Sequence, residues 1–144
     1  MTSSVFPDLN VWIALTLATH EHHPAATAWY ESLPPTTELV FCRITQLGFL
    51  RLLTTPGIAP TGGMTQLEAW AAYDLWVQSG ACVYCEEPFG IEIELRAFAQ
   101  RDKPSHKQWG DSYLAAFAAA ASLELVTFDK ALSMRAYRAT LLNG

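Results

Sequence analysis

The sequence predicts an α/β fold in which helices cover a mainly parallel sheet. Short apolar runs typical of buried strands alternate with longer segments whose apolar residues recur at helical period. Near the C-terminal end, an alanine-rich helix leads directly into a buried strand, the order found in parallel α/β units. Of the 144 residues, 51% are hydrophobic, which is enough to bury the core of one compact domain over residues 1–144.

The expected elements follow from periodicity, caps and helix breakers. Strands are expected at 5–8, 38–42, 82–85 and 123–128, and helices at 11–18, 24–33, 43–53, 66–78, 91–100 and from 111 onward. Thr65 and Glu68 form a capping box that predicts a helix start at Gln66. Leu114, Phe117 and Ala118 make the apolar stripe of the last expected helix.

Three aspartates lie where an expected strand ends or an expected helix begins. Asp8 follows the first strand, Asp111 opens the last helix and Asp129 follows the last strand. Each one alone is explained as a helix cap or a turn residue. In a parallel sheet, however, all three positions fall at the carboxyl edge, where open α/β sheets bind ligands. Three carboxylates converging there predict a site for a hard cation.

Two further polar residues are expected close to this edge. Asn10 is suited to cap the helix that follows Asp8. Gln46 is the polar member of a stripe with Phe49 and Leu50, one turn into the helix after the second strand. We expect Gln46 to face the aspartates, where its carbonyl oxygen brings no negative charge, although hydrogen bonding to local backbone would also explain it.

The charge distribution is uneven along the chain. The net charge of −5 argues against broad nonspecific binding of nucleic acid, yet seven of the nine bases lie in residues 96–144. Basic side chains around a carboxylate cluster suit a phosphate-bearing substrate, although an ordinary solvated surface would have the same composition. Arg43, Lys107 and Lys130 are the candidate contacts to phosphate.

Neither the cysteines nor the histidines predict a zinc site. Cys82 and Cys85 form a single CxxC within an expected strand, and Cys42 stands apart, so we expect buried thiols. The histidines at 20–23 are expected in an exposed loop, with one lining a cleft. No apolar run is long enough to span a membrane and the N-terminus lacks the features of an export signal, so we expect a cytoplasmic protein.

Four segments together resemble the PIN domain, most closely the ribonuclease toxins of VapBC toxin–antitoxin systems. They are Asp8-x-Asn10, Arg43-x-Thr45-Gln46-x-x-Phe49-x-Arg51-Leu52, Trp109-x-Asp111-x-x-Leu114-Ala115-Ala116 and Leu125-x-Thr127-Phe128-Asp129. The order and spacing of these segments carry the resemblance, which spans nearly the whole chain.

The resemblance implies a three-layer α/β/α sandwich, Mg²⁺- or Mn²⁺-dependent cleavage of RNA, and a VapB-like antitoxin partner. By position, Asp8, Asp111 and Asp129 match the acidic metal-site residues of the family, and Thr127 matches the polar residue just before the last of them. Many family members place a glutamate where this chain has Gln46, which implies a weaker metal site. We expect Gln46, Thr127 and Asn10 to support the bound ion indirectly, and exposed apolar helix surface would suit a homodimer.

The expected reaction is metal-assisted hydrolysis of a phosphodiester bond, leaving a 5′-phosphate and a 3′-hydroxyl. Two alternatives remain open. One is a catalytically weak module that binds RNA or a protein partner. The other is a phosphotransfer enzyme with Asp8 as its nucleophile, for which beryllofluoride trapping at Asp8 is the discriminating experiment.

Overall fold

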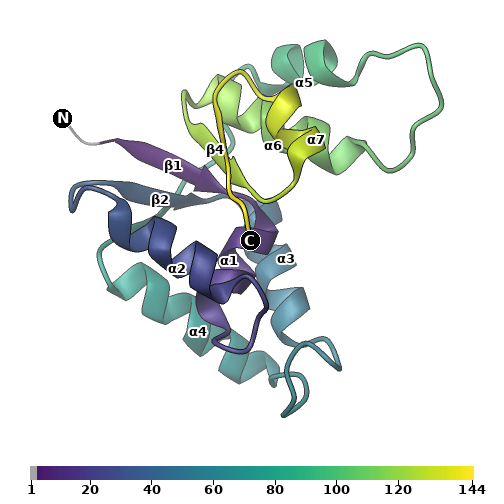
Figure 1. Cartoon of the computed structure of the whole chain (residues 1–144). Helices are drawn as coiled ribbons and strands as arrows, with labels where there is room; N and C mark the ends of the chain where they lie inside the picture. The colour runs from purple at the N-terminus through teal and green to yellow at the C-terminus, as the bar shows by residue number, and fades with distance from the viewer. Residues whose placement is uncertain (1–2) are drawn as a thin grey trace.

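The protein is built on one parallel sheet of five strands, as a computed structural model of residues 3–144 shows (Figure 1). The strands are β1 (Ser4–Pro7), β2 (Glu38–Phe41), β3 (Cys82–Tyr84), β4 (Glu124–Thr127) and β5 (Ala139–Leu141). Their order across the sheet is β3-β2-β1-β4-β5, and every neighbouring pair is parallel. The predicted parallel sheet is confirmed. The expectation about an N-terminal export signal falls partly on residues 1–2, outside the described range.

Helices cover both faces of the sheet. They are α1 (Leu9–Thr16), α2 (His23–Ser32), α3 (Arg43–Leu53), α4 (Gln66–Gln78), α5 (Ile91–Ala99), α6 (Trp109–Ala120) and α7 (Lys130–Arg135). In Figure 1, α1 to α4 lie on one side of the strands, whereas α5, α6 and α7 lie on the other. The result is the predicted three-layer α/β/α arrangement. Between residues 3 and 144, no helix has both the length and the hydrophobicity needed to cross a membrane.

Successive side chains of each strand point to opposite faces of the sheet, so the protein has two hydrophobic cores, one on each face. Val5 and Val126 point toward α1 to α4, whereas their strand neighbours Phe6 and Leu125 point toward α5 to α7. Trp12 stacks on Phe41 of β2 in the first core, with ring centroids 3.9 Å apart. These buried contacts fix both helical layers to the sheet and thereby fix where the helix ends lie.

The chain reverses its direction of travel across the sheet next to β1. The first three strands are added in one direction, and the chain then crosses to the other face and returns to place β4 on the free side of β1. Such a switch point between two strands leaves a crevice at the carboxyl edge, where ligands of open α/β sheets bind. Asp8 directly follows β1, and Asp129 follows β4 after one intervening residue.

The helix boundaries differ from the expectations at two functionally important places. Asp8, and not Asn10, is the N-cap of α1, because its extended backbone lets its side chain accept a hydrogen bond from the Leu9 N–H. Helix α6 begins at Trp109, so Gly110 lies inside its first turn and Asp111 is its third residue. The elements predicted from the sequence also stop before Lys130, whereas the structure adds α7 and β5, which complete the sheet beside β4.

Candidate active site

Asp8 is a buried carboxylate fixed at the end of β1. Its backbone N–H donates to the carbonyl of Val126 at 2.8 Å, which ties the ends of β1 and β4 together. Its Oδ1 accepts from the Leu9 N–H at 2.6 Å, and its Oδ2 accepts from the Thr127 hydroxyl at 2.9 Å. Asp8 is only 8% exposed. Both carboxylate oxygens are therefore oriented by the fold.

Thr127 connects Asp8 to Asp129. The buried Thr127 hydroxyl donates to Asp8 and accepts from the Asp129 N–H at 2.9 Å. The Asp129 carboxylate then caps α7, because its Oδ1 accepts from the N–H groups of Ala131 and Leu132. Asp129 is itself exposed. One hydroxyl thus links the two acidic positions that flank the switch point.

Asp111 brings a third carboxylate to the same region from the first turn of α6. Burial raises the pKa of Asp111, the negative charge of Asp129 raises it further, and Arg135 acts in the opposite direction. Burial likewise raises the pKa of Asp8, its hydrogen bonds from Thr127 and Leu9 oppose that change, and Asp111 and Asp129 add to it. Because Asp129 acts on the pKa of Asp111, and both of them act on the pKa of Asp8, the three carboxylates share one region of negative potential.

The donor atoms of this region suit a hard divalent cation. They are carboxylate oxygens supported by a hydroxyl, the set that Mg²⁺ and Mn²⁺ prefer, whereas zinc prefers nitrogen and sulfur donors. The three cysteines are free and belong to other segments. As the side chains stand between residues 3 and 144, no three acidic, histidine or cysteine groups enclose an ion. The chemistry of the region fits Mg²⁺.

Gln46 and Arg43 interact with each other at the start of α3. Gln46 is buried, and its Oε1 accepts a hydrogen bond from the Arg43 guanidinium. The exposed Arg43 additionally lies over the ring of Tyr84, 4.9 Å from its centroid. Arg43 therefore has two partners within the fold, and its guanidinium orients the side chain of Gln46.

The other predicted polar residues lie on the surface around the carboxylates. Lys107 lies in the loop before α6 and Lys130 opens α7, and both are exposed. Asn10 is also exposed and lines a hollow of about 280 Å³ together with His20, His22 and Asp129. We expected one histidine to line a cleft, and the structure has two, His20 and His22, lining this hollow beside Asp129.

Arg135 and Ser112 form a contact that the sequence did not reveal. The Arg135 guanidinium donates from Nη2 to the Ser112 hydroxyl and to the carbonyl of Phe98 at 3.0 Å. This joins the end of α7 to the end of α5 and to the residue next to Asp111. The sequence contains the basic residue but gives no indication of α7, so the direction of its side chain could not be predicted.

Comparison with known proteins identifies the family. Residues 5–136 match the family model of the PIN domain, and the chain belongs to this family. The chain is 43% identical over 130 residues to Ribonuclease VapC41 of Mycobacterium tuberculosis, an alignment that covers 88% of this chain and 89% of that protein.

Two solved structures share the fold at low sequence identity. The Mycobacterium tuberculosis toxin VapC20, described as cleaving the Sarcin-Ricin loop, matches with a TM-score of 0.67 at 19% identity, covering 90% of this chain and 93% of that one. VapBC2 from Rickettsia felis, bound to a DNA fragment from its promoter, matches with a TM-score of 0.70 at 10% identity, covering 97% and 99%.

Proposed function

We propose that the protein is a metal-dependent endoribonuclease, the toxin of a type II toxin–antitoxin pair, which hydrolyses RNA phosphodiester bonds with Mg²⁺ or Mn²⁺. The observation that carries this proposal is the shared negative region of Asp8, Asp111 and Asp129 at the switch point between β1 and β4. The 43% identity to a protein named as a ribonuclease supports the same class of reaction.

Each residue has a separate role in this proposal. Asp8, Asp111 and Asp129 hold the cation, and Thr127 orients Asp8 through the hydrogen bond to Oδ2. When bound, the cation polarises the phosphoryl group and lowers the pKa of a water for in-line attack. The exposed side chains of Lys107 and Lys130 contact the RNA backbone and contribute no base readout.

Metal substitution is the direct experiment. The purified chain is incubated with RNA in EDTA and then with Mg²⁺, Mn²⁺ or Zn²⁺ added in excess of the chelator. We expect cleavage with Mg²⁺ or Mn²⁺ and products that carry a 5′-phosphate and a 3′-hydroxyl. Cleavage that persists in EDTA, or that only Zn²⁺ restores, contradicts the proposed site.

A VapB-like antitoxin is the proposed protein partner. Support comes from the fold shared with VapBC2, which was solved with promoter DNA. Expression of the chain alone should arrest growth, and co-expression of a small protein encoded next to it should restore growth and copurify with the chain. An Asp111→Asn chain that still arrests growth would show that the toxicity does not come from the proposed site.

A second candidate function is RNA binding with little turnover. The side-chain arrangement favours it in one respect, since between residues 3 and 144 no three potential ligands enclose an ion. Gln46 also adds no charge to the region. Retention of RNA without any cleavage at millimolar Mn²⁺ would favour this second function over the first.

A further inference from the structure

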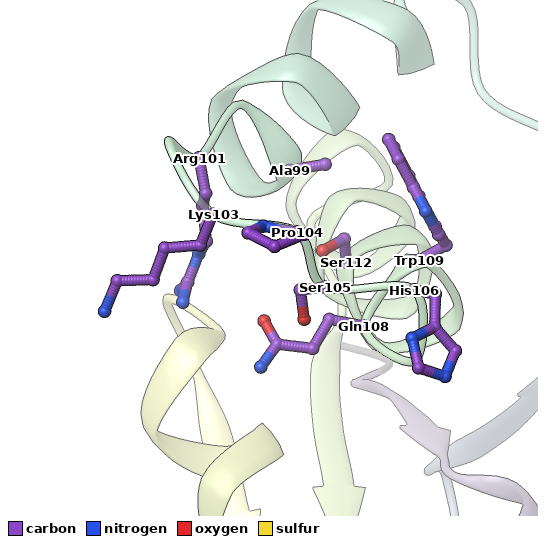
Figure 2. A pocket seen from close by; sticks show the side chains of 9 residues that line it. All are labelled: Ala99, Arg101, Lys103, Pro104, Ser105, His106, Gln108, Trp109 and Ser112. Carbon is purple, nitrogen blue, oxygen red and sulfur yellow. The ribbon is translucent and has the colours of Figure 1, made fainter.

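A hollow lies between the end of α5 and the start of α6, the helix that carries Asp111 of the proposed active site. Its volume is about 370 Å³, within the range of sites for small molecules and too small for a duplex. Figure 2 shows the side chains around it: Ala99, Arg101, Lys103, Pro104, Ser105, His106, Gln108, Trp109 and Ser112. Ser112, which lines the hollow, directly follows Asp111 in the chain.

One side of the hollow carries positive charge. Arg101 and Lys103 lie together on this side (Figure 2), and between residues 3 and 144 neither of them has an acidic partner within 4.0 Å. Arg135 lies behind Ser112, and its Nε and Nη1 are buried without a hydrogen-bond partner in the described chain. Burial lowers the pKa of Arg135, repulsion by Arg101 lowers it further, and the charge of Asp111 acts in the opposite direction. An anion bound here would relieve that repulsion.

The other side of the hollow presents an aromatic surface. Trp109 and His106 lie opposite the basic pair in Figure 2, and Trp109 is 62% exposed although it is the first residue of α6. An exposed indole at the rim of a hollow offers a face on which a nucleic acid base can stack. Ser105, Ser112 and Gln108 lie between the two sides and supply hydrogen-bonding groups.

We propose that this hollow binds one unpaired nucleotide of the RNA, with its phosphate against Arg101 and Lys103 and its base against Trp109. The proposal rests on the proposed function and adds to it the place and the contacts of one nucleotide. Stacking on Trp109 requires a base that is not paired in a duplex. Arg135 holds Ser112 and the end of α5 in place behind the hollow.

Binding measured without metal separates this subsite from catalysis. Fluorescence anisotropy follows a short fluorescein-labelled single-stranded RNA of mixed sequence in EDTA, with a gel to verify that the RNA stays intact. The double variant Arg101→Gln, Lys103→Gln should bind more weakly and lower the magnitude of the slope of log K against log salt by about 0.7 for each phosphate that is no longer neutralised. Arg51→Gln, which removes one positive charge near the far end of α3, should leave both quantities close to those of the parent.

The tryptophan gives a different signature. Trp109→Ala should weaken RNA binding by about tenfold through loss of stacking and leave the salt slope unchanged. Trp109→Phe should retain most of the affinity, because a phenyl ring still stacks. The matched control is Trp70→Ala on α4, a similarly exposed tryptophan on the opposite face of the sheet, which should bind RNA like the parent.

The outcomes distinguish the two proposals. If the parent chain binds no RNA in EDTA, or if the hollow variants bind like the parent, the subsite is wrong whatever the cleavage assay gives. If the variants behave as expected and the parent cleaves nothing with Mn²⁺, the nuclease proposal fails and the subsite stands. If the variants lose affinity only for a labelled oligoglutamate peptide and not for RNA, the hollow belongs to an acidic protein segment and the subsite is overturned.

Discussion

At the scale of single residues, the proposed site combines carboxylates that repel one another with neighbouring groups that stabilise their negative charge. Burial raises the pKa of both Asp8 and Asp111, and the negative charge of Asp129 raises both further. Thr127 and Arg135 act against this from opposite sides, the first by a hydrogen bond to Asp8 and the second by its positive charge near Asp111. A divalent cation is the group that would relieve the remaining repulsion.

Asp111→Asn should abolish most RNA cleavage while leaving the fold intact. Loss of one carboxylate weakens the hold on the cation, and the rate should fall by more than the roughly 10- to 100-fold typical when a residue that supports a metal ligand is replaced. Cleavage rate and circular dichroism are the measurements. Asp74→Asn, an identical change at an exposed position of α4, is the matched control and should cleave like the parent.

The metal-free protein should become less sensitive to pH when Asp111 is removed. Because the pKa of Asp111 is raised above 3.8 in the folded state, the folded protein binds this proton more tightly than the unfolded chain does. This group therefore increases the free energy of unfolding as the pH falls through the raised pKa toward 3.8. At neutral pH the increase is absent.

Urea unfolding in EDTA at a series of pH values measures this effect. Asp111→Asn should be more stable than the parent at pH 7, and the difference should shrink as the pH is lowered through that window. A difference that grows on acidification would mean that the carboxylate is stabilised, not strained, by its surroundings.

At the scale of elements, the ends of β1 and β4 behave as one unit. The Asp8 N–H bonds to Val126, and the Thr127 hydroxyl bridges Asp8 and the Asp129 N–H that starts α7. A strand end, its neighbour and a helix start are thus held by one buried side chain.

Thr127→Val tests this unit with almost no change of shape. The substitution removes one hydrogen-bond partner from the buried Asp8 carboxylate and one from the Asp129 N–H. It should therefore lower the free energy of unfolding by about 1–3 kcal/mol. RNA cleavage should fall as well, because Asp8 loses its orientation. The control is Thr140→Val on β5, whose hydroxyl donates to Glu124 away from the site. Equal effects of the two substitutions on cleavage would mean that Thr127 only stabilises the sheet.

The elements also explain which features could be predicted from the sequence. The long periodic helices and buried strands could, because alternation and helical period reflect which face is buried. Helix α7 could not, since its six residues give too short a pattern, and three-residue β5 lacks a buried run. Asn10 and Asp8 are both suitable caps for α1 by residue type, and only the backbone conformation shows that Asp8 forms the cap. The contact between Arg135 and Ser112 spans 23 residues and is set by packing alone.

At the scale of the whole molecule, the site lies at the junction of the two helical layers. Asp8 starts α1 on one face of the sheet, and Asp111 lies in the first turn of α6 on the other. A cation that joins them would bind the folded chain and not the unfolded one, so binding should appear as stability.

Mn²⁺ should therefore raise the thermal midpoint of the protein. At a concentration of 100 times its Kd, a ligand specific for the folded state adds about 2.7 kcal/mol, which corresponds to a rise in Tm of roughly 5–10 °C for a chain of this size. Differential scanning fluorimetry with and without Mn²⁺ measures the shift. The shift should be largely lost in Asp111→Asn, and an undiminished shift there would locate the ion elsewhere.

The arrangement of the acids along the chain has a consequence during synthesis. Asp8 leaves the ribosome more than a hundred residues before Asp111 and Asp129, and β4 must still pair with β1 to bring them together. A nascent chain halted before β4 contains Asp8 and Asp111 but lacks Asp129 and the strand that pairs with β1. Under the proposed mechanism, hydrolysis of RNA therefore begins only after β4 has emerged and has joined the sheet.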